Sequence, residues 1–354
     1  PGSPVGVEFG YGLQFPARYQ KALYICDWTF GTMYAIHMTP DGSSYTADKE
    51  EFVSRTPLPL TDVAAGPDGA LYFTIGGRGA QSELFRVTYT GDQSTEPASL
   101  PDEAFAADRQ MRQMVESFHG RDFEVQEFVD SVRNGAASGF PVDRLNARRG
   151  DRAIVTALRR VTQNKVMAGY LVETLHDPDR TNNEHVEAIT ALVRGIGRNG
   201  LEPDHIRPAC IRTLKQMPFE TMSADEQLKY LRTLSLTWIR LGAPNETEQQ
   251  TFLAALDSHF PSSDTQVNRE LCQVLVYLKS PTVVSRTIEL LRQEPRREDI
   301  DMGELLTRNA GYAKAINAMI ASQPDKDQVW YAFCLRVAET GWTLDLRADY
   351  FRWF

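Results

Sequence analysis

The chain has 354 residues, of which 42% are hydrophobic and 24% charged, and its formal net charge is −9. This composition is typical of globular proteins, and the acidic balance argues against a nucleic-acid partner, because phosphate binding requires a basic face. No run of about 18 apolar residues occurs, so no transmembrane segment is predicted. The length favours two domains. No signal peptide is visible and the sequence begins at Pro1, so we expect that its start was processed or cut away.

Residues 61–89 have the pattern of one blade of a β-propeller. Three short strands are predicted, at 62–65, 70–75 and 83–89. The turn Pro67-Asp68-Gly69 separates the first two strands, and a glycine-rich bend at 76–79 separates the second from the third. Proline presets φ at the start of a turn and glycine accepts a positive φ at its end, so these residues suit tight antiparallel connections. This alternation of strands and turns is typical of a propeller blade.

A similar pattern lies upstream. Strands are predicted at 22–27 and 32–38, a second Pro-Asp-Gly turn occupies 40–42, and residues 51–55 are expected to form an outer strand. Residues 1–21 are expected to be an irregular connection. Residues 1–92 are therefore predicted to form a partial β-propeller of about two blades. Because a propeller closes with about 4–8 blades, we expect this part to belong to a larger ring and the chain to be a fragment.

A polar linker is predicted at 93–101, and an all-α domain at 102–354, which makes the predicted fold class α+β and multidomain. The clearest helix signal is 223–242, where Ser223 and Glu226 have the spacing of a capping box. A loop is expected at 135–150. Other helices are expected near 105–118, 125–134, 154–161, 166–175, 185–196, 245–260, 271–278, 281–291, 303–322 and 325–340, with a last one after Trp342. Such a series favours a HEAT-like α-solenoid or an irregular bundle.

The last predicted helix carries Tyr350, Phe351, Trp353 and Phe354. Because a solenoid needs a polar outer cap, this aromatic end predicts that a further segment follows in a longer parent chain. The alternative is that the aromatic helix packs back on its own domain.

Few residues point to chemistry. The six histidines are dispersed, with no HExxH motif, and are expected to be surface or capping residues. The four cysteines are far apart in apolar surroundings, which favours buried free thiols, although a disulfide between Cys210 and Cys272 stays open. No catalytic or metal-binding residue is predicted.

Asp27, Trp28 and Arg78 are the candidate ligand-binding residues. Asp27 and Trp28 directly follow a predicted inner strand, and Arg78 lies on the bend after a later one. In a propeller such bends open on one face around the central channel, where an aromatic ring, a carboxylate and a guanidinium could together hold a polar ring. The alternative is that Trp28 packs between blades and Asp27 caps a turn.

Four segments of this region carry a family resemblance: Leu60-Thr61-Asp62-Val63, Gly66-Pro67-Asp68-Gly69-Ala70-Leu71-Tyr72, Gly76-Gly77-Arg78 and Leu84-Phe85-Arg86-Val87. They resemble the closing blades of soluble quinoprotein glucose/sorbosone dehydrogenase-like propellers. The order of propeller, helices and an end with Gly341-Trp342-Thr343 and Tyr350-Phe351-Arg352-Trp353-Phe354 is similar to large exported bacterial proteins described as membrane-bound dehydrogenases.

The resemblance implies a periplasmic or secreted parent that joins the propeller to a HEAT-like region and a haem c module. Such a parent would oxidise an aldose- or sorbosone-type sugar with pyrroloquinoline quinone and calcium, and would pass electrons to haem. In that family the catalytic base and calcium ligands lie in earlier blades. The basic residues that reach the quinone carboxylates align here with Thr29, Pro59 and Thr61, none of which is basic.

We therefore expect this chain to bind no cofactor and to be inactive alone, with the remaining blades and the haem c domain as its partners. No CxxCH motif for haem attachment is present. The alternative is a degenerate propeller that binds carbohydrate or protein, with the helices as a scaffold. The non-basic residues at 29 and 61 favour this alternative for the propeller.

Overall fold

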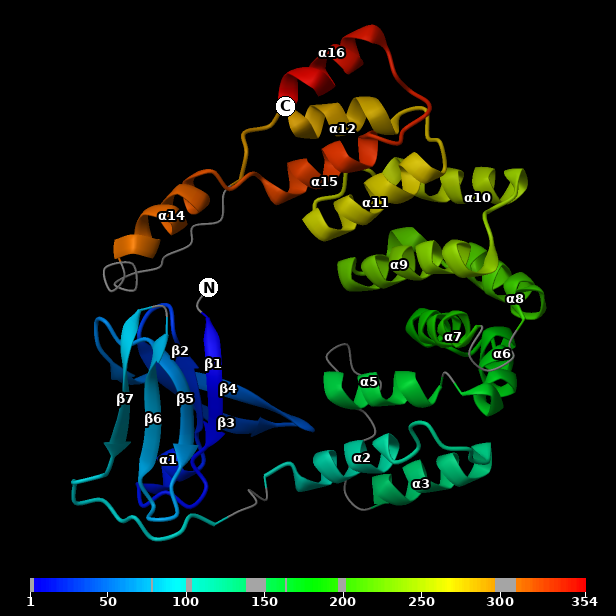
Figure 1. The fold of residues 1–354 in the computed structure, drawn as a ribbon. Helices are drawn as coiled ribbons and strands as arrows, with labels where there is room; N and C mark the ends of the chain where they lie inside the picture. Colours follow the sequence, from blue (N-terminus) through cyan, green and yellow to red (C-terminus); the bar gives the residue numbers. More distant parts are fainter. Residues whose placement is uncertain are drawn as a thin grey trace. The chain divides into compact units, whose positions relative to one another are not determined.

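A computed structural model of the chain describes residues 3–77, 79–99, 104–137, 151–162, 164–196, 202–296 and 310–354. The fold is α+β, with two small antiparallel sheets and a long series of helices (Figure 1). The chain divides into two compact units. The sheet unit comprises Pro1–Gln113, Gly135–Ile154 and Asp299–Gln323, and the helical unit comprises Met114–Asn134, Val155–Glu298 and Pro324–Phe354.

The first sheet is an antiparallel meander of four strands in chain order. Its strands are β1 (Pro4–Phe9), β2 (Leu23–Asp27), β3 (Thr32–Asp41) and β4 (Ser44–Ser54), and the short helix α1 (Ala17–Gln20) lies between β1 and β2. The strands predicted at 22–27 and 32–38 are confirmed. Two expectations are wrong, because residues 1–21 contain a strand and the outer strand begins well before residue 51. The first half of β4 is polar and exposed, so it lacks the alternation that predicts a strand, and pairing with β3 orders it.

The second sheet is a three-stranded antiparallel meander of β5 (Leu60–Ala65), β6 (Leu71–Gly77) and β7 (Ala80–Val87), as predicted for 61–89. β1 lies beside β5. A Cβ atom on Gly6 would lie 2.7 Å from the Asp62 Cα, so glycine is required for this close approach. The two sheets share one core, which includes Leu13, Phe15, Tyr24, Cys26, Met33, Leu60, Leu71, Phe73 and Ile75.

Within the sheet unit, the buried side chain of Gln20 joins α1 to the segment that follows β7. Its Nε2 donates to the carbonyls of Thr95 (3.3 Å) and Glu96 (2.9 Å), and its Oε1 accepts a hydrogen bond from the Ala98 N–H at 2.8 Å. The described part of the predicted linker is thus irregular in conformation but anchored to α1.

Helices account for most of the described residues after 104, and no strand is found in that part of the structure. Their bounds are α2 (Ala106–Glu116), α3 (Val125–Ala137), α5 (Arg152–Val161), α6 (Ala168–His176), α7 (Asn182–Gly195), α8 (Pro203–Gln216), α9 (Ala224–Leu241), α10 (Glu246–Leu256), α11 (Thr265–Tyr277), α12 (Val283–Leu291), α14 (Ala310–Ala321), α15 (Lys326–Leu335) and α16 (Leu344–Trp353). Most of the predicted loop at 135–150 lies outside the described residues.

Sequence reasoning missed α8. Its two prolines explain this, because proline opposes a helix interior. Pro203 occupies the first turn, where its missing N–H costs nothing, and Pro208 is tolerated inside the helix. The capping box predicted at the start of α9 is confirmed, since the Ser223 N–H donates to Glu226 Oε2 at 2.8 Å.

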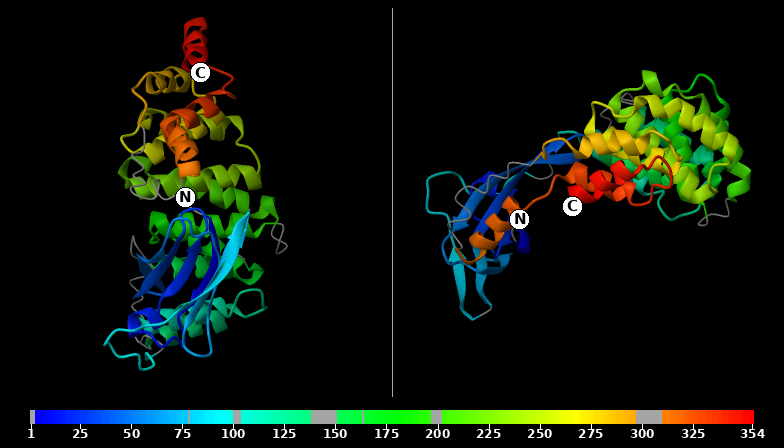
Figure 2. Two further views of the ribbon diagram at one scale, coloured as in Figure 1. Left: turned by 60° about the vertical axis from the view of Figure 1, so that its left-hand side comes forward. Right: turned by 90° about the horizontal axis from the view of Figure 1, so that it is seen from above.

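The helical unit is built around a row of stacked helices (Figures 1 and 2). α7 packs on α9, α9 on α11, and α11 on α15. Against this row lie α6, α8, α10 and α12, and α16 packs on α12. Apolar stripes at helical spacing, such as Leu231, Leu234, Trp238 and Leu241 of α9, are buried between these helices.

The aromatic residues of α16 divide between two environments. Tyr350 donates its hydroxyl to the Ala332 carbonyl at 3.0 Å, and Trp353 Nε1 donates to Gln328 Oε1 at 2.9 Å. Phe351 and Phe354 remain 70% and 78% exposed. The helix therefore packs back on its own unit through Tyr350 and Trp353.

Candidate functional site

The structure brings together two of the bends that the sequence singled out. Asp27 ends β2 and is buried, and its Oδ1 accepts hydrogen bonds from the backbone N–H groups of Ser3, Thr29 and Phe30. Trp28 Nε1 donates to the Gly76 carbonyl at 3.2 Å, so the indole links the first sheet to the second. The turn-capping role of Asp27 is thus present.

The third residue of that predicted trio, Arg78, lies outside the described residues. Its neighbour Gly77 is exposed, and a Cβ atom there would lie 3.9 Å from Trp28 Nε1. The ligand-binding role of Asp27, Trp28 and Arg78 stays a prediction.

A polar cluster on the first sheet was not visible in the sequence. Glu50 on β4 accepts hydrogen bonds from Arg18 Nη2 (2.8 Å), the Tyr19 hydroxyl (2.9 Å) and His37 Nε2 (2.7 Å). Burial acts to raise the pKa of Glu50, but the hydrogen bonds from His37 and Tyr19 and the charge of Arg18 outweigh it and lower that pKa. His37 and Glu50 are 13 residues apart, and only the β3–β4 register brings them together.

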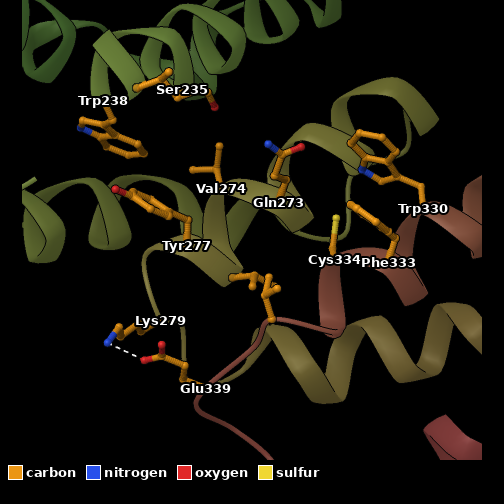
Figure 3. Close-up of a pocket in the computed structure, with 13 residues that line it drawn as sticks. Ser235, Trp238, Gln273, Val274, Tyr277, Lys279, Trp330, Phe333, Cys334 and Glu339 are labelled. Atoms are coloured by element: carbon orange, nitrogen blue, oxygen red, sulfur yellow. Dashed lines mark ion pairs between the residues drawn. The ribbon is translucent and has the colours of Figure 1, made fainter. Parts of the chain in front are cut away.

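The helical unit has an apolar groove formed by α9, α11, α15 and the segments after α11 and α15, with a volume of about 590 Å³ (Figure 3). We call it the α9/α11/α15 groove. It is lined by Ser235, Trp238, Ile239, Gln273, Val274, Val276, Tyr277, Lys279, Trp330, Phe333, Cys334, Val337 and Glu339. On each helix these residues recur at helical spacing, so each helix presents one continuous face to the groove.

Aromatic rings dominate the lining. The rings of Trp238 and Tyr277 lie 5.5 Å apart between centroids, and those of Trp330 and Phe333 lie 6.4 Å apart. Tyr277 is 50% exposed, so the groove opens to solvent. The sequence carried a partial signal for this surface, because 271–278 is apolar nearly all round. One side of α11 is in the core, and Tyr277 on another side faces the groove.

Polar groups are few, and the two charged ones lie at one end of the groove. Lys279 Nζ and Glu339 Oε2 form an ion pair at 2.7 Å there, and Figure 3 shows it below the aromatic residues. Lys279 holds the pKa of Glu339 below its usual value. Both side chains are more than half exposed, so this pair orients two chains at the mouth of the groove and adds little stability.

Two searches of the described residues give negative results. No helix there is both long and apolar enough to cross a membrane. No group of three or more His, Cys, Asp or Glu side chains in those parts of the chain is placed to hold a metal ion. Comparison with protein-family models, curated proteins and solved structures gives no match to this chain.

Proposed function

We propose that this chain is a binding module whose α9/α11/α15 groove takes the apolar face of an amphipathic peptide helix. The observation that carries the proposal is the groove itself. Its volume of about 590 Å³ falls within the range of about 300–1,000 Å³ for ligand sites, and its lining is largely apolar and aromatic with a few polar groups.

The exposure of the lining favours a peptide over a small molecule. Ile239 is 75% exposed, Val337 61% and Phe333 54%. A small ligand is usually buried over about 70–90% of its surface, which so open a groove does not provide. A peptide helix covers a wider surface and places apolar side chains every three or four residues, which matches a groove between helices.

In this proposal the helical unit is a HEAT-like scaffold, and the sequence spacing of its inter-helix contacts supports this. Thr190 of α7 contacts Thr233 of α9 across 43 residues, and Arg232 of α9 contacts Glu270 of α11 across 38 residues. The first spacing falls within the range of about 40–47 residues at which helix pairs recur in HEAT and armadillo proteins, the second is slightly shorter, and the α11–α15 contact of Trp330 with Arg269 spans 61 residues. Solenoids of this kind use the surface formed by successive helices to bind partners.

In the same proposal the sheet unit is a pair of propeller blades, and its strand order and exposed apolar residues support this. Each sheet is a meander in chain order, and the first strands of the two sheets lie side by side. On β1, Val5 is 49%, Val7 60% and Phe9 36% exposed, although Gly6 between them is buried. Antiparallel sheets with one face in water are polar on that face, so an apolar outer row fits a sheet covered on both sides by neighbouring blades.

A second candidate is the enzyme function implied by the resemblance. A parent dehydrogenase of the aldose or sorbosone type would hold pyrroloquinoline quinone and calcium in other blades and pass electrons to haem c, as an exported protein. The side-by-side bends at Trp28 and Gly76 favour it, because propeller enzymes bind ligands at such bends. Reduction of a dye by a parent protein loaded with the quinone and calcium, over a panel of aldoses, tests this candidate, and no turnover would exclude it.

The peptide proposal is tested with the full chain and a fluorescently labelled, uncharged amphipathic helical peptide of about 18 residues with leucine anchors. We expect saturable binding by fluorescence anisotropy. Ile239→Asp and Val337→Asp place a carboxylate in the groove without touching the core, and each should weaken binding at least about tenfold.

The matched control is Leu344→Asp on α16, which changes an 85% exposed apolar residue outside the groove and should leave the affinity unchanged. Equal binding by the groove variants and the unmodified chain, or no binding by the unmodified chain, would reject the proposal.

A further inference from the structure

Two buried cysteines face one another between α11 and α15. Cys272 is 0% and Cys334 5% exposed. They lie on the packed helices α11 and α15, close enough for each thiol to shift the pKa of the other, and the Cys272 sulfur lies 3.6 Å from Thr287 Oγ1 on α12. The sequence left a Cys210–Cys272 pairing open, but the cysteine that meets Cys272 in the structure is Cys334.

The register of the two helices fixes this meeting independently. Before the pair, Trp330 Nε1 donates to the Arg269 carbonyl at 3.1 Å. After it, Thr340 Oγ1 donates to the Lys279 carbonyl at 3.2 Å. Both contacts join residues 61 positions apart, and Cys272 and Cys334 lie between them at nearly the same separation. The chain on either side of the cysteines is therefore held in parallel alignment, which keeps the sulfurs opposite one another.

The surroundings distinguish this pair from the other two cysteines. Cys334 lines the α9/α11/α15 groove and is 5% exposed, so the groove is the route by which the pair lies nearest to solvent. Cys26 and Cys210 are fully buried, and burial raises the pKa of each thiol to about 12. The two neighbouring thiols shift their pKa values apart, lowering that of Cys272 and raising that of Cys334, so Cys272 is the more easily deprotonated sulfur of the pair.

We propose that Cys272 and Cys334 form a redox modification site that peroxides convert into a disulfide and dithiols restore. One sulfur attacks the peroxide, the O–O bond breaks, and a sulfenic acid and one water form. The second sulfur attacks the sulfenic sulfur, the S–S bond forms, and the S–O bond breaks as hydroxide leaves with the thiol proton as a second water. The two sulfurs lose two electrons and the peroxide gains them. The site stands on the cysteine geometry and does not require the groove to bind a peptide.

The test counts thiols in the native full chain after treatment with hydrogen peroxide, followed by unfolding and alkylation. The chain has four cysteines, so we expect the alkylated number to fall from four to two and to return to four after dithiothreitol. Peptide mapping should then show a cross-link between the peptides that contain Cys272 and Cys334.

The matched variants separate this pair from general oxidation. Cys210→Ser should still lose two thiols reversibly, whereas Cys272→Ser and Cys334→Ser should each lose the ability to form a reversible cross-link. A cross-link that uses Cys26 or Cys210, irreversible oxidation only, or four unchanged thiols in the unmodified chain would each overturn the proposal.

Discussion

The sheet unit and the helical unit use apolar side chains in different ways. In the sheet unit, alternate residues of the strands meet in one shared core, and β1 carries an exposed apolar row. In the helical unit, α9 and α11 bury one stripe in the core and present a second set of apolar side chains to the groove. A strand has only two faces, whereas a helix surrounded by neighbours can serve a core and a binding surface together.

This comparison is tested most strongly by one matched core substitution in each unit. Leu71 of β6 and Leu231 of α9 are both 0% exposed. Leu71→Ala and Leu231→Ala should each lower the free energy of unfolding of their own unit by about 2–5 kcal/mol, because each removes buried methyl groups and leaves a cavity. Hydrogen exchange measured by mass spectrometry assigns the loss of protection to strands or to helices.

If the two units unfold separately, faster exchange after Leu71→Ala stays within the sheet unit, and after Leu231→Ala within helices α6 to α12, α15 and α16 of the helical unit. An equal loss of protection in both units after either substitution would show that they unfold as one, and the comparison would fail.

The sequence predicted the parts of the fold that depend on local signals. Glycine and aspartate turns with short apolar alternation located most strands between 22 and 89, and the capping box located α9. β1, the first half of β4 and α8 were missed, because polar or proline-containing segments there are ordered by pairing and packing with distant parts of the chain.

The candidate sites depend still more on tertiary structure. The groove combines residues of α9, α11 and α15 that are far apart in sequence, and no local pattern specifies that they meet. The same holds for Cys272 with Cys334, and for Glu50 with Arg18, Tyr19 and His37. Only the apolar character of 271–278 on several sides gave an advance signal.

A smaller loss of stability is expected from a substitution in the turn between β2 and β3, and it tests whether the conformation of that turn is fixed. Gly31, between β2 and β3, has φ +62°, and a Cβ atom there would lie 2.6 Å from the Arg55 carbonyl oxygen. Gly31→Ala should therefore destabilise the sheet unit by about 2–3 kcal/mol, through left-handed backbone strain and the clash. Denaturant unfolding followed by circular dichroism measures the loss.

Gly12 is the control that measures the cost of left-handed backbone strain without a steric clash. Its φ is +86°, but a Cβ atom there meets nothing within 4 Å. Gly12→Ala should cost about 1 kcal/mol, from the backbone alone. Equal losses for the two variants would mean that the Gly31 turn moves away from Arg55 without cost, and that the turn does not fix the sheet.

The smallest expected effect is on the pH dependence of stability. It compares Glu50 of the sheet unit, which has several hydrogen-bond partners, with the exposed ion pair of Glu339 in the helical unit. The pKa of Glu50 is lowered in the folded state, so its charge stabilises the fold above the ordinary glutamate value of about 4.3, and this contribution is lost as the pH falls through the folded value. Glu50→Gln should lower stability at neutral pH and remove that part of the acid dependence, so the two stability curves converge as the pH falls through the folded-state pKa of Glu50. Glu339→Gln should change the curve less, because Glu339 is 69% exposed and solvent screens its ion pair with Lys279. The free energy of unfolding of both variants is measured from pH 3 to 7. A larger loss of stability for Glu339→Gln than for Glu50→Gln would mean that the contacts of Glu50 with Arg18 and His37 do not act as a network.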